Sequence, residues 1–358
     1  MTIIEVARSA GVSTATAGRV LGGYGYASSD IKDRVRQAAE ALGYRPNRLA
    51  RSLITGKTQT IGVVAGDIES PFYASVLRGI GDVARGEGFG VIVTNSDEEP
   101  ALEREAVQLL LEKQVDGLIV APCDPAASKH LHDAVAANFP VVQIDRAARG
   151  LAADSVSVDN LGAARHCIEV LFAAGHRRVG IIAELERPFD DLASFLDQAP
   201  RLISDANTLM PSWQRLLGYL QAHHDAGVEV DLRLVRRSGG YSAAAAKEAT
   251  LALLQGEDRP SALFTADGLM SLGALDAVTD LGLSIPGELS LVCFDDLDWM
   301  KFMRPGISAV AQPVYDVGRA AAECVLARIN GTRTPLRRVV LATTLNLRGS
   351  IAPPATPE

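Results

Sequence analysis

Short, continuous apolar runs alternate with helical patterns over most of this 358-residue chain. Such runs are typical of strands that are buried on both faces of a parallel sheet and connected by helices. The expected strands are 61–66, 89–96, 116–122, 141–145, 179–184, 232–236, 262–266 and 289–295. Helices are expected from Pro71 to about Glu87, from Pro100 to Lys113 and near 126–138. This alternation predicts an α/β body.

A break near 145–160 divides the expected strands into two sets, which predicts two lobes. In this architecture ligands lie at the carboxyl ends of the strands, here in a cleft between the lobes. The GxGxxG, Walker and GxSxG motifs follow none of the expected strands. Because nucleotide-dependent and hydrolase chemistry lack their signatures, we expect a protein that is not an enzyme.

Composition favours a globular protein with no cofactor and no metal ion. Hydrophobic residues make up 47% and charged residues 22%, and no apolar run approaches the ~20 residues that cross a bilayer. The first residues, "MTIIEVARSAG", lack the order of a secretory signal, so we expect a cytoplasmic protein without membrane contact.

The four cysteines are far apart, which predicts buried free thiols. The histidine pairs His130/His132 and His223/His224 have no partners at ligand spacing, and we expect them on solvated helix faces.

Charge is distributed unevenly along the chain. Residues 1–59 contain nine lysines and arginines and four acidic residues, a net charge of +5, whereas the whole chain carries −8. A small basic module on an acidic body indicates a polyanionic partner for the module alone. A solvated basic tail is the alternative, but a tail would not show a helical pattern.

The basic module contains three short helical patterns. Ile3, Ile4, Val6, Ala7 and Ala10 form one apolar side, and Gly11 is suited to a helix stop. A second helix, 14–21, follows a serine cap and faces inward with Ala17, Val20 and Leu21. A third helix begins after residue 28 or 29 and reaches residue 42. Two short helices across a tight turn, braced by a third, match a helix-turn-helix, although an ordinary helical hairpin is equally consistent with these residues.

The order of several motifs decides between these two interpretations. "VARSAGVSTATAGRVL" (6–21) and "YRPNRLARSL" (44–53) resemble the N-terminal signature and the hinge of the LacI family of bacterial transcription regulators. The resemblance continues through "TIGVV", "SPFY", "VDGLIVAP", "VDN", "GHRRVGII", "FDD" and "QPVYDVG". It implies a helix-turn-helix domain (1–45), a hinge (46–59), a two-lobed periplasmic-binding-protein-like body with parallel sheets (60–349) and a flexible tail (350–358).

The resemblance also implies contacts with a palindromic operator. One module reaches a half-site, so a homodimer is expected. Arg19 is the long donor that can bind a guanine edge, unless it is merely solvated, and Leu53 matches the leucine that wedges into the minor groove. The expected DNA-binding residues are Thr2, Ser13, Thr14, Ala15, Thr16, Arg19, Ser28, Tyr44, Asn47, Ala50 and Leu53. Gly18 and Gly22 stand where the family usually has serine and asparagine, which predicts weaker DNA binding or an unusual operator.

For the body, the resemblance implies a small-molecule effector. The expected effector-binding residues are Phe72, Asp145, Arg215, Tyr241, Asp267 and Asp295. Carboxylates and a guanidinium suit sugar hydroxyls, and aromatic faces suit the C–H side of a sugar ring. A core role is the alternative for the two aromatic residues, and a turn cap is the alternative for Asp145. The family more usually has asparagine followed by aspartate where this chain has Asp267 and Gly268. Because several carboxylates repel anions, this set of residues favours neutral sugars and polyols.

Two segments fit the family pattern poorly. Residues 185–211, called the insertion below, are longer than the usual loop, and an amphipathic helix is plausible around Phe189, Leu192, Phe195 and Leu196. The insertion is expected to be either a lid on the cleft or a plain surface addition. The tail "RGSIAPPATPE" has no leucine heptad, which favours a dimer over a tetramer.

Together these observations predict a DNA-binding repressor controlled by a carbohydrate-like effector. Two rivals use the same body. A transporter's solute-binding protein would need a signal peptide and no basic module, and a glycosidase-like enzyme could use Asp267 and Asp295 as acid and base.

Overall fold

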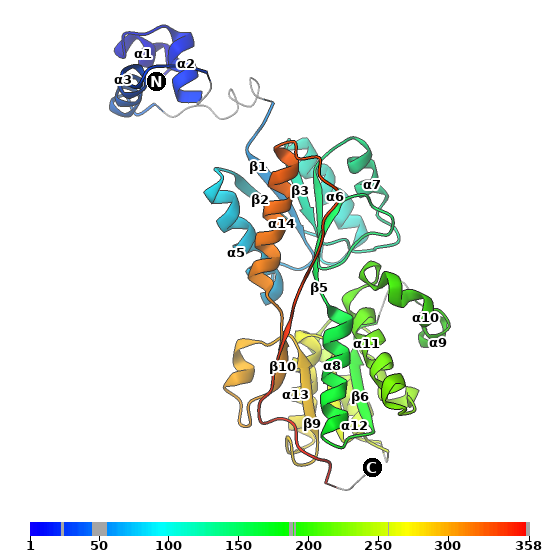
Figure 1. The fold of residues 1–358 in the computed structure, drawn as a ribbon. Coiled ribbons are helices and arrows are strands. Elements are labelled where there is room, and N and C mark those ends of the chain that lie inside the picture. The colour runs from blue at the N-terminus through cyan, green and yellow to red at the C-terminus, as the bar shows by residue number, and fades with distance from the viewer. Residues whose placement is uncertain (23–24, 45–55, 186–188, 190, 257, 356–358) are drawn as a thin grey trace. The chain divides into compact units, whose positions relative to one another are not determined.

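The computed structural model describes residues 1–358 except 23–24, 45–55, 186–188, 190, 257 and 356–358. By its contacts the chain divides into two units (Figure 1). The first contains Met1–Thr60 with Leu111–Asp116, and the second contains Ile61–Leu110 with Gly117–Glu358. Among the described residues, no helix is long and apolar enough to cross a membrane.

The first unit contains three helices, α1 (Ile3–Ser9), α2 (Thr14–Gly22) and α3 (Ser29–Ala41). Their small core includes Val6, Ala17 and Val35, which are fully buried. Gly11 has a φ of +64° between α1 and α2, as a helix stop of this kind requires. Ile4 was expected on the apolar side of α1 but is 56% exposed, because only one face of so short a helix can reach the core. The helix-turn-helix architecture is confirmed.

The second unit contains two lobes, each with one six-stranded sheet. The first lobe has the strand order β11-β5-β4-β3-β1-β2. These strands are β1 (Thr60–Ala65), β2 (Gly90–Asn95), β3 (Gly117–Val120), β4 (Val141–Ile144), β5 (Asp154–Val158) and β11 (Arg338–Leu341). β3 pairs in parallel with β1 and β4, and β5 pairs in parallel with β4 and β11. Helices α5 (Pro71–Gly86) and α14 (Val314–Ile329) cover one face, and α6 (Pro100–Glu112) and α7 (Lys129–Ala136) cover the other (Figure 1).

The second lobe has the strand order β12-β10-β9-β8-β6-β7. These strands are β6 (Val179–Ala183), β7 (Val235–Arg237), β8 (Ala262–Thr265), β9 (Ser290–Phe294), β10 (Ser308–Ala311) and β12 (Thr344–Asn346). All the pairs are parallel except β10 with β12, which is antiparallel. Helices α8 (Asn160–Ala173) and α11 (Pro211–Ala226) pack on one face, and α12 (Ala243–Leu254) and α13 (Gly268–Asp280) pack on the other.

Glycines allow the paired helices to cross closely. A Cβ at Gly79 of α5 would collide with the carbonyl oxygen of Tyr315 in α14, and one at Gly318 would collide with that of Val76. Gly218 of α11 lies in the same way against the carbonyl oxygen of Leu161 in α8. The α5–α14 pair of the first lobe and the α8–α11 pair of the second are therefore in close backbone contact.

The chain passes between the lobes three times, at 158–160, 311–314 and 341–344. Each lobe is consequently built from separate parts of the sequence. The expected strand 232–236 is wrong in part, because Leu232–Leu234 form a 3₁₀ turn and β7 begins only at Val235. A further 3₁₀ turn, Asp298–Lys301, follows β9. Strands β5, β10, β11 and β12 were not expected.

The described part of the insertion folds onto the second lobe. It forms α9 (Leu192–Leu196), α10 (Ala199–Leu202) and a 3₁₀ segment, Ile203–Thr208. Phe195 is fully buried, and its ring centroid lies 4.5 Å from that of Trp213. Phe189 lies 4.9 Å from the same ring. The insertion is therefore part of the hydrophobic core of its lobe rather than a loose surface loop.

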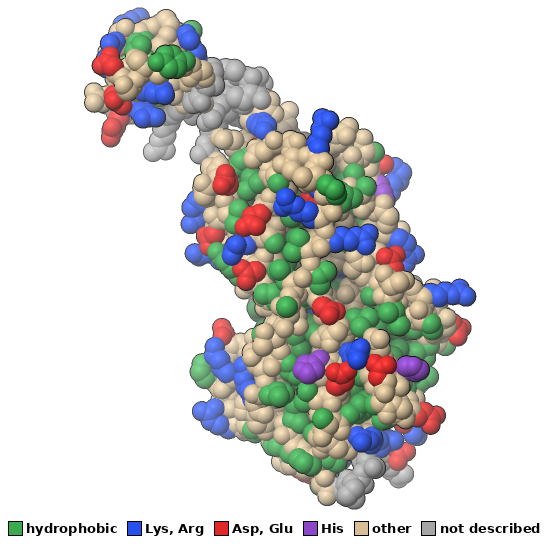
Figure 2. Space-filling view, in the orientation of Figure 1, with side chains coloured by type: hydrophobic (Ala, Val, Ile, Leu, Met, Phe, Trp, Pro, Cys, Tyr) green, Lys and Arg blue, Asp and Glu red, His purple; other side chains and the backbone are tan. Residues whose placement is uncertain are grey.

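Other expectations differ from the structure. The tail is attached at its start, because the amide of Ala352 donates to Ser290 Oγ and Ser350 is fully buried. His130 pairs with buried Glu103 over 2.7 Å, and His223 is only 2% exposed, so neither lies on a solvated face. The four cysteines are buried free thiols, as expected. On the visible face of the molecule, acidic and basic side chains are interspersed with apolar ones (Figure 2).

Candidate functional site

A cavity that opens to solvent lies between the two lobes of the second unit. The residues around it come from the carboxyl ends of strands and from the helices that follow them. All six residues that were expected to bind an effector line it: Phe72, Asp145, Arg215, Tyr241, Asp267 and Asp295. The structure thus brings together side chains that are separated by more than two hundred positions in the sequence. Ligand contact by these residues stays a prediction.

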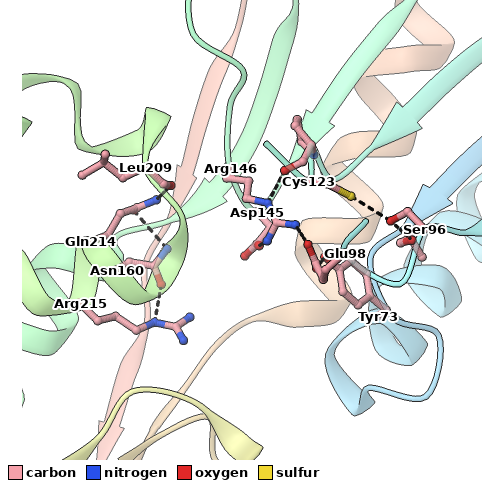
Figure 3. A network of polar contacts seen from close by, with 12 residues as sticks. Tyr73, Ser96, Glu98, Cys123, Asp145, Arg146, Asn160, Leu209, Gln214 and Arg215 are labelled. Atoms are coloured by element: carbon pink, nitrogen blue, oxygen red, sulfur yellow. Dashed lines mark hydrogen bonds and ion pairs between the residues drawn. The ribbon is translucent and has the colours of Figure 1, made fainter. Parts of the chain in front are cut away.

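Arg215 projects from α11 toward the space between the lobes (Figure 3). It lies four positions after the helix start at Pro211. Its Nε donates to Asn160 Oδ1 over 3.0 Å, and its Nη1 donates to the carbonyl oxygen of Ala266. The guanidinium carbon lies 3.7 Å from the ring centroid of Phe294. The side chain is thereby held at 5% exposure, and its Nη2 makes no hydrogen bond within the described part of the chain.

Asp267 caps α13 and is almost fully buried. Its Oδ1 accepts from the amides of Leu269 (2.8 Å) and Met270 (2.9 Å). Burial, with a smaller contribution from the nearby Asp295, raises the pKa of Asp267 to about 6. The residue can therefore exchange a proton near neutral pH.

Asp295 follows β9 with a φ of +69° and faces the same cavity. Its Oδ2 accepts from the amide of Gly268 over 3.0 Å, and its Oδ1 accepts from Nε2 of Gln312 over 2.5 Å. Gln312 comes from one of the crossings between the lobes. Asp295 is therefore hydrogen-bonded to segment 311–314, one of the segments about which the lobes would move.

The wall on the first lobe is an ion cluster. Arg146 pairs with Glu98 and with Asp145 (3.2 Å), and the hydroxyl of Tyr73 donates to Glu98 over 3.2 Å (Figure 3). Burial raises the pKa of Asp145 and the pKa of Glu98, while the guanidinium of Arg146 opposes both shifts. The Asp145 side chain is thus occupied by an ion pair and not by a turn cap.

The aromatic residues differ in their surroundings. Phe72 is half-buried and meets Tyr73 edge-to-face, with ring centroids 5.1 Å apart. Tyr241 is 43% exposed, which excludes the core role that was considered for it. Both rings line the cavity and offer apolar faces to a ligand.

Several cavity residues were missed by the sequence analysis. They are Ser70, Tyr73, Glu98, Arg146, Glu184, Met210, Pro211, Ser212 and Gln312. Arg146 follows a strand directly, so the strand-end rule that found its neighbour Asp145 could have found it. Gln312 lies in the quoted motif "QPVYDVG". Glu98 comes from a loop, Met210 and Pro211 from the end of the insertion and Ser212 from the first turn of α11, and no sequence pattern marks these positions.

An acidic hollow adjoins the cavity and shares Glu98, Glu184, Met210 and Tyr241 with it. Its acidic lining adds Asp67, Glu69, Asp97 and Glu99. The described residues contain no group of three histidine, cysteine or acidic side chains that could hold a metal ion.

The DNA-facing predictions fall on the first unit. Ser13, Thr14, Ala15 and Arg19 are exposed at α2, and Ser13 Oγ accepts from the amide of Thr16 over 3.1 Å. Thr2 and Ser28 cap α1 and α3, so their hydroxyls already serve the fold. Tyr44 is partly buried against the small core. Asn47, Ala50 and Leu53 lie outside the described residues, and DNA contact by the whole set stays a prediction.

A helix-turn-helix unit joined to a two-lobed body with parallel sheets defines a class of regulators that bind DNA and a small ligand. Comparison with known families supports this class. Residues 2–47 match the model for bacterial regulatory proteins of the lacI family, and residues 168–351 match a periplasmic binding protein-like domain.

Among curated proteins, the HTH-type transcriptional regulator PtxS of Pseudomonas plecoglossicida is 32% identical over 98% of this chain and 95% of its own length. The HTH-type transcriptional repressor CytR of Escherichia coli K12 is 30% identical over 98% of this chain and 96% of its own length. The chain therefore belongs to the LacI family of transcriptional regulators.

Solved structures agree in fold. A complex of the transcriptional regulator CelR with cellobiose is 28% identical, covers 98% of this chain and 99% of its own, and has a TM-score of 0.69. The lac repressor dimer bound to operator and the anti-inducer ONPF is 23% identical with the same coverage and a TM-score of 0.81, a likeness of fold alone.

Proposed function

We propose that this chain is a transcriptional repressor whose operator affinity is controlled by a carbohydrate-like effector in the cavity between its lobes. The observation that carries the proposal is the lining of that cavity. Arg215, Asp267 and Asp295 offer fixed donors and acceptors, and Phe72 and Tyr241 offer apolar faces. The CelR complex supports the choice of ligand class, since that relative holds cellobiose.

The coupling between ligand and DNA follows from the connections between the lobes. A ligand that touches Asp145 on one lobe and Arg215 on the other favours one arrangement of the lobes. The three crossings at 158–160, 311–314 and 341–344 are the segments that adjust. A movement of the first lobe, which follows residues 46–59 in the chain, then alters how the hinges of the two subunits meet on DNA. By linkage, DNA weakens the effector by the same factor as the effector weakens DNA.

The DNA side of the proposal rests on the basic first unit. Arg19 is exposed on α2, where its guanidinium can reach a guanine edge. Because one unit reads a half-site, a homodimer on a palindromic operator completes the complex. A protein that binds chromosomal DNA works in the cytoplasm, and we propose that location for this chain. We assign no catalytic step to Asp267 or Asp295, because both are held by amide donors of their own chain.

The test is thermal unfolding of the full chain against sugars, polyols, sugar acids and purines. A ligand at ~100 times its Kd adds about 2.7 kcal/mol, a shift of several degrees for a protein of this size. Specific DNA binding by the full chain that disappears when residues 1–59 are removed separates a regulator from a solute-binding protein or an enzyme. DNA binding that survives this deletion contradicts the proposal.

A further inference from the structure

Among the described residues of the cavity, Arg215 is a cation that makes no direct ion pair, and the charges of Asp145 and Asp267 act on it only at longer range. Glu98 and Asp145 are both paired with Arg146, and Asp267 and Asp295 accept hydrogen bonds from backbone amides and Gln312. Arg215, by contrast, donates only to the neutral oxygens of Asn160 and Ala266, and it forms no ion pair with any described carboxylate. A buried charge is costly unless it is paired, so this guanidinium is suited to an anionic partner.

The helix that carries Arg215 adds further donors on the same side. Ser212 lies three residues before Arg215 on α11, so both side chains share one face of the helix. Ser212 is 5% exposed, it lines the cavity, and its hydroxyl has no hydrogen-bond partner in the described structure. The N-cap residue, Met210, offers no side-chain oxygen to the first turn of α11, where Pro211 has no amide proton and the amide of Trp213 donates to the carbonyl oxygen of Met210. An uncapped helix N-terminus favours negative charge.

Acceptor groups of the same cavity have the opposite requirement, and one of them, Asp267, directly follows Ala266, whose carbonyl oxygen binds Arg215. Oε1 of Gln312 is buried there without a partner in the described structure. Asp267 uses Oδ1 for its amide bonds, which leaves Oδ2 as an acceptor. These oxygens need donors, which the hydroxyl groups of a ligand supply.

From these donors and acceptors we propose that the effector is a hydroxylated carboxylic acid whose carboxylate binds Arg215 and Ser212 at the start of α11. Its hydroxyl groups donate to Gln312 and to the carboxylates of the second lobe. The inference rests on the proposed function, because it names the effector class of the same cavity. It differs from the neutral sugar that the number of carboxylates favoured.

The test uses matched pairs of compounds, the aldonic acids and alditols of five and six carbon atoms, with the full chain in titration calorimetry. A charge-assisted hydrogen bond is worth about 1.5–3 kcal/mol, so the acid of a pair binds at least about tenfold tighter than its alditol. The Ser212→Ala variant lowers the affinity for the acid about fivefold or more and leaves that for the alditol within about twofold. Ser204→Ala, an exposed serine of the insertion, is the matched control and changes neither.

A second variant keeps the inference testable if Ser212→Ala changes the affinity only slightly. Arg215→Gln, checked for folding by its thermal transition, removes the preference for the acid. Alditols or neutral sugars that bind as tightly as the acids overturn the inference, while the proposed function stands. An acid that binds as expected but leaves DNA affinity unchanged supports the inference and contradicts the proposed function. If neither member of any pair binds, the inference is wrong.

Discussion

The amide of Ala147 donates a hydrogen bond to the carbonyl oxygen of Asn207 over 3.0 Å. Ala147 follows β4 in the first lobe, whereas Asn207 belongs to the insertion, which is anchored in the second lobe. The insertion therefore links the lobes at a place separate from the three crossings. It also ends at Met210, which lines both the cavity and the acidic hollow. Of the two roles expected for it, these contacts favour the lid.

Phe195 anchors the insertion in the core of the second lobe, so replacing Phe195 should detach the insertion from that core. We expect Phe195→Ala to lower the free energy of unfolding by about 3–5 kcal/mol, because a fully buried ring leaves a cavity beside Trp213. Urea unfolding followed by tryptophan fluorescence measures the change. Ile203→Ala is the control within the same segment, because Ile203 is 45% exposed and should lose much less. Equal losses for the two variants would show that Phe195 is not an anchor.

Asp267 should make stability depend on pH. Its pKa of about 6 lies above that of the unfolded chain, so ionisation of Asp267 costs stability in the folded state. This cost is absent below about pH 4, grows between about pH 4 and 6, and is complete above that range. Asp267→Asn keeps the oxygen that accepts from Leu269 and Met270 but removes the charge.

We therefore expect Asp267→Asn to unfold with a higher free energy than the natural chain at pH 7.5, by up to about 3 kcal/mol. The difference should shrink toward zero near pH 4. Chemical denaturation of both proteins from pH 4 to 8 measures it. A difference that stays constant over this range would refute the titration of Asp267.

Arg19 should determine operator sequence. Arg19→Ala is expected to weaken binding to the best operator by about 1–3 kcal/mol and to relax the preference at one base pair of each half-site. Arg36→Ala removes the same charge from an exposed position of α3 and serves as the matched control. Fluorescence anisotropy against operators with single base-pair changes distinguishes the two. Loss of affinity without any change in sequence preference would make Arg19 a phosphate contact.

The sequence was sufficient for the elements whose signal is local. Continuous apolar runs predicted β1, β3 and β9, and strand ends placed Asp145, Asp267 and Asp295 around one cavity. β5, "DSVSV", was missed because its alternating polar residues do not look like a strand that is buried on both faces. β11 and β12 are edge strands with mixed exposure.

What the sequence could not supply are the pairings made by the closed fold. The ion pair between Glu98 and Arg146 depends on where the loop after β2 lies. That Ser212 and Gln312 keep buried polar atoms without partners among the described residues follows only from the three-dimensional arrangement. His130 was placed in solvent because its partner, Glu103, is distant in sequence.

Operator binding by the full chain in the presence of effector tests the central claim most directly. The probe is a palindromic duplex selected by the protein from a random library, and the effector is the compound that gives the largest thermal shift. We predict that saturating effector changes the Kd for this duplex by about 5- to 150-fold. Asp295→Asn should bind the duplex as the natural chain does but lose most of this response. An unchanged Kd in the natural chain, or a full response in the variant, would contradict control through this cavity.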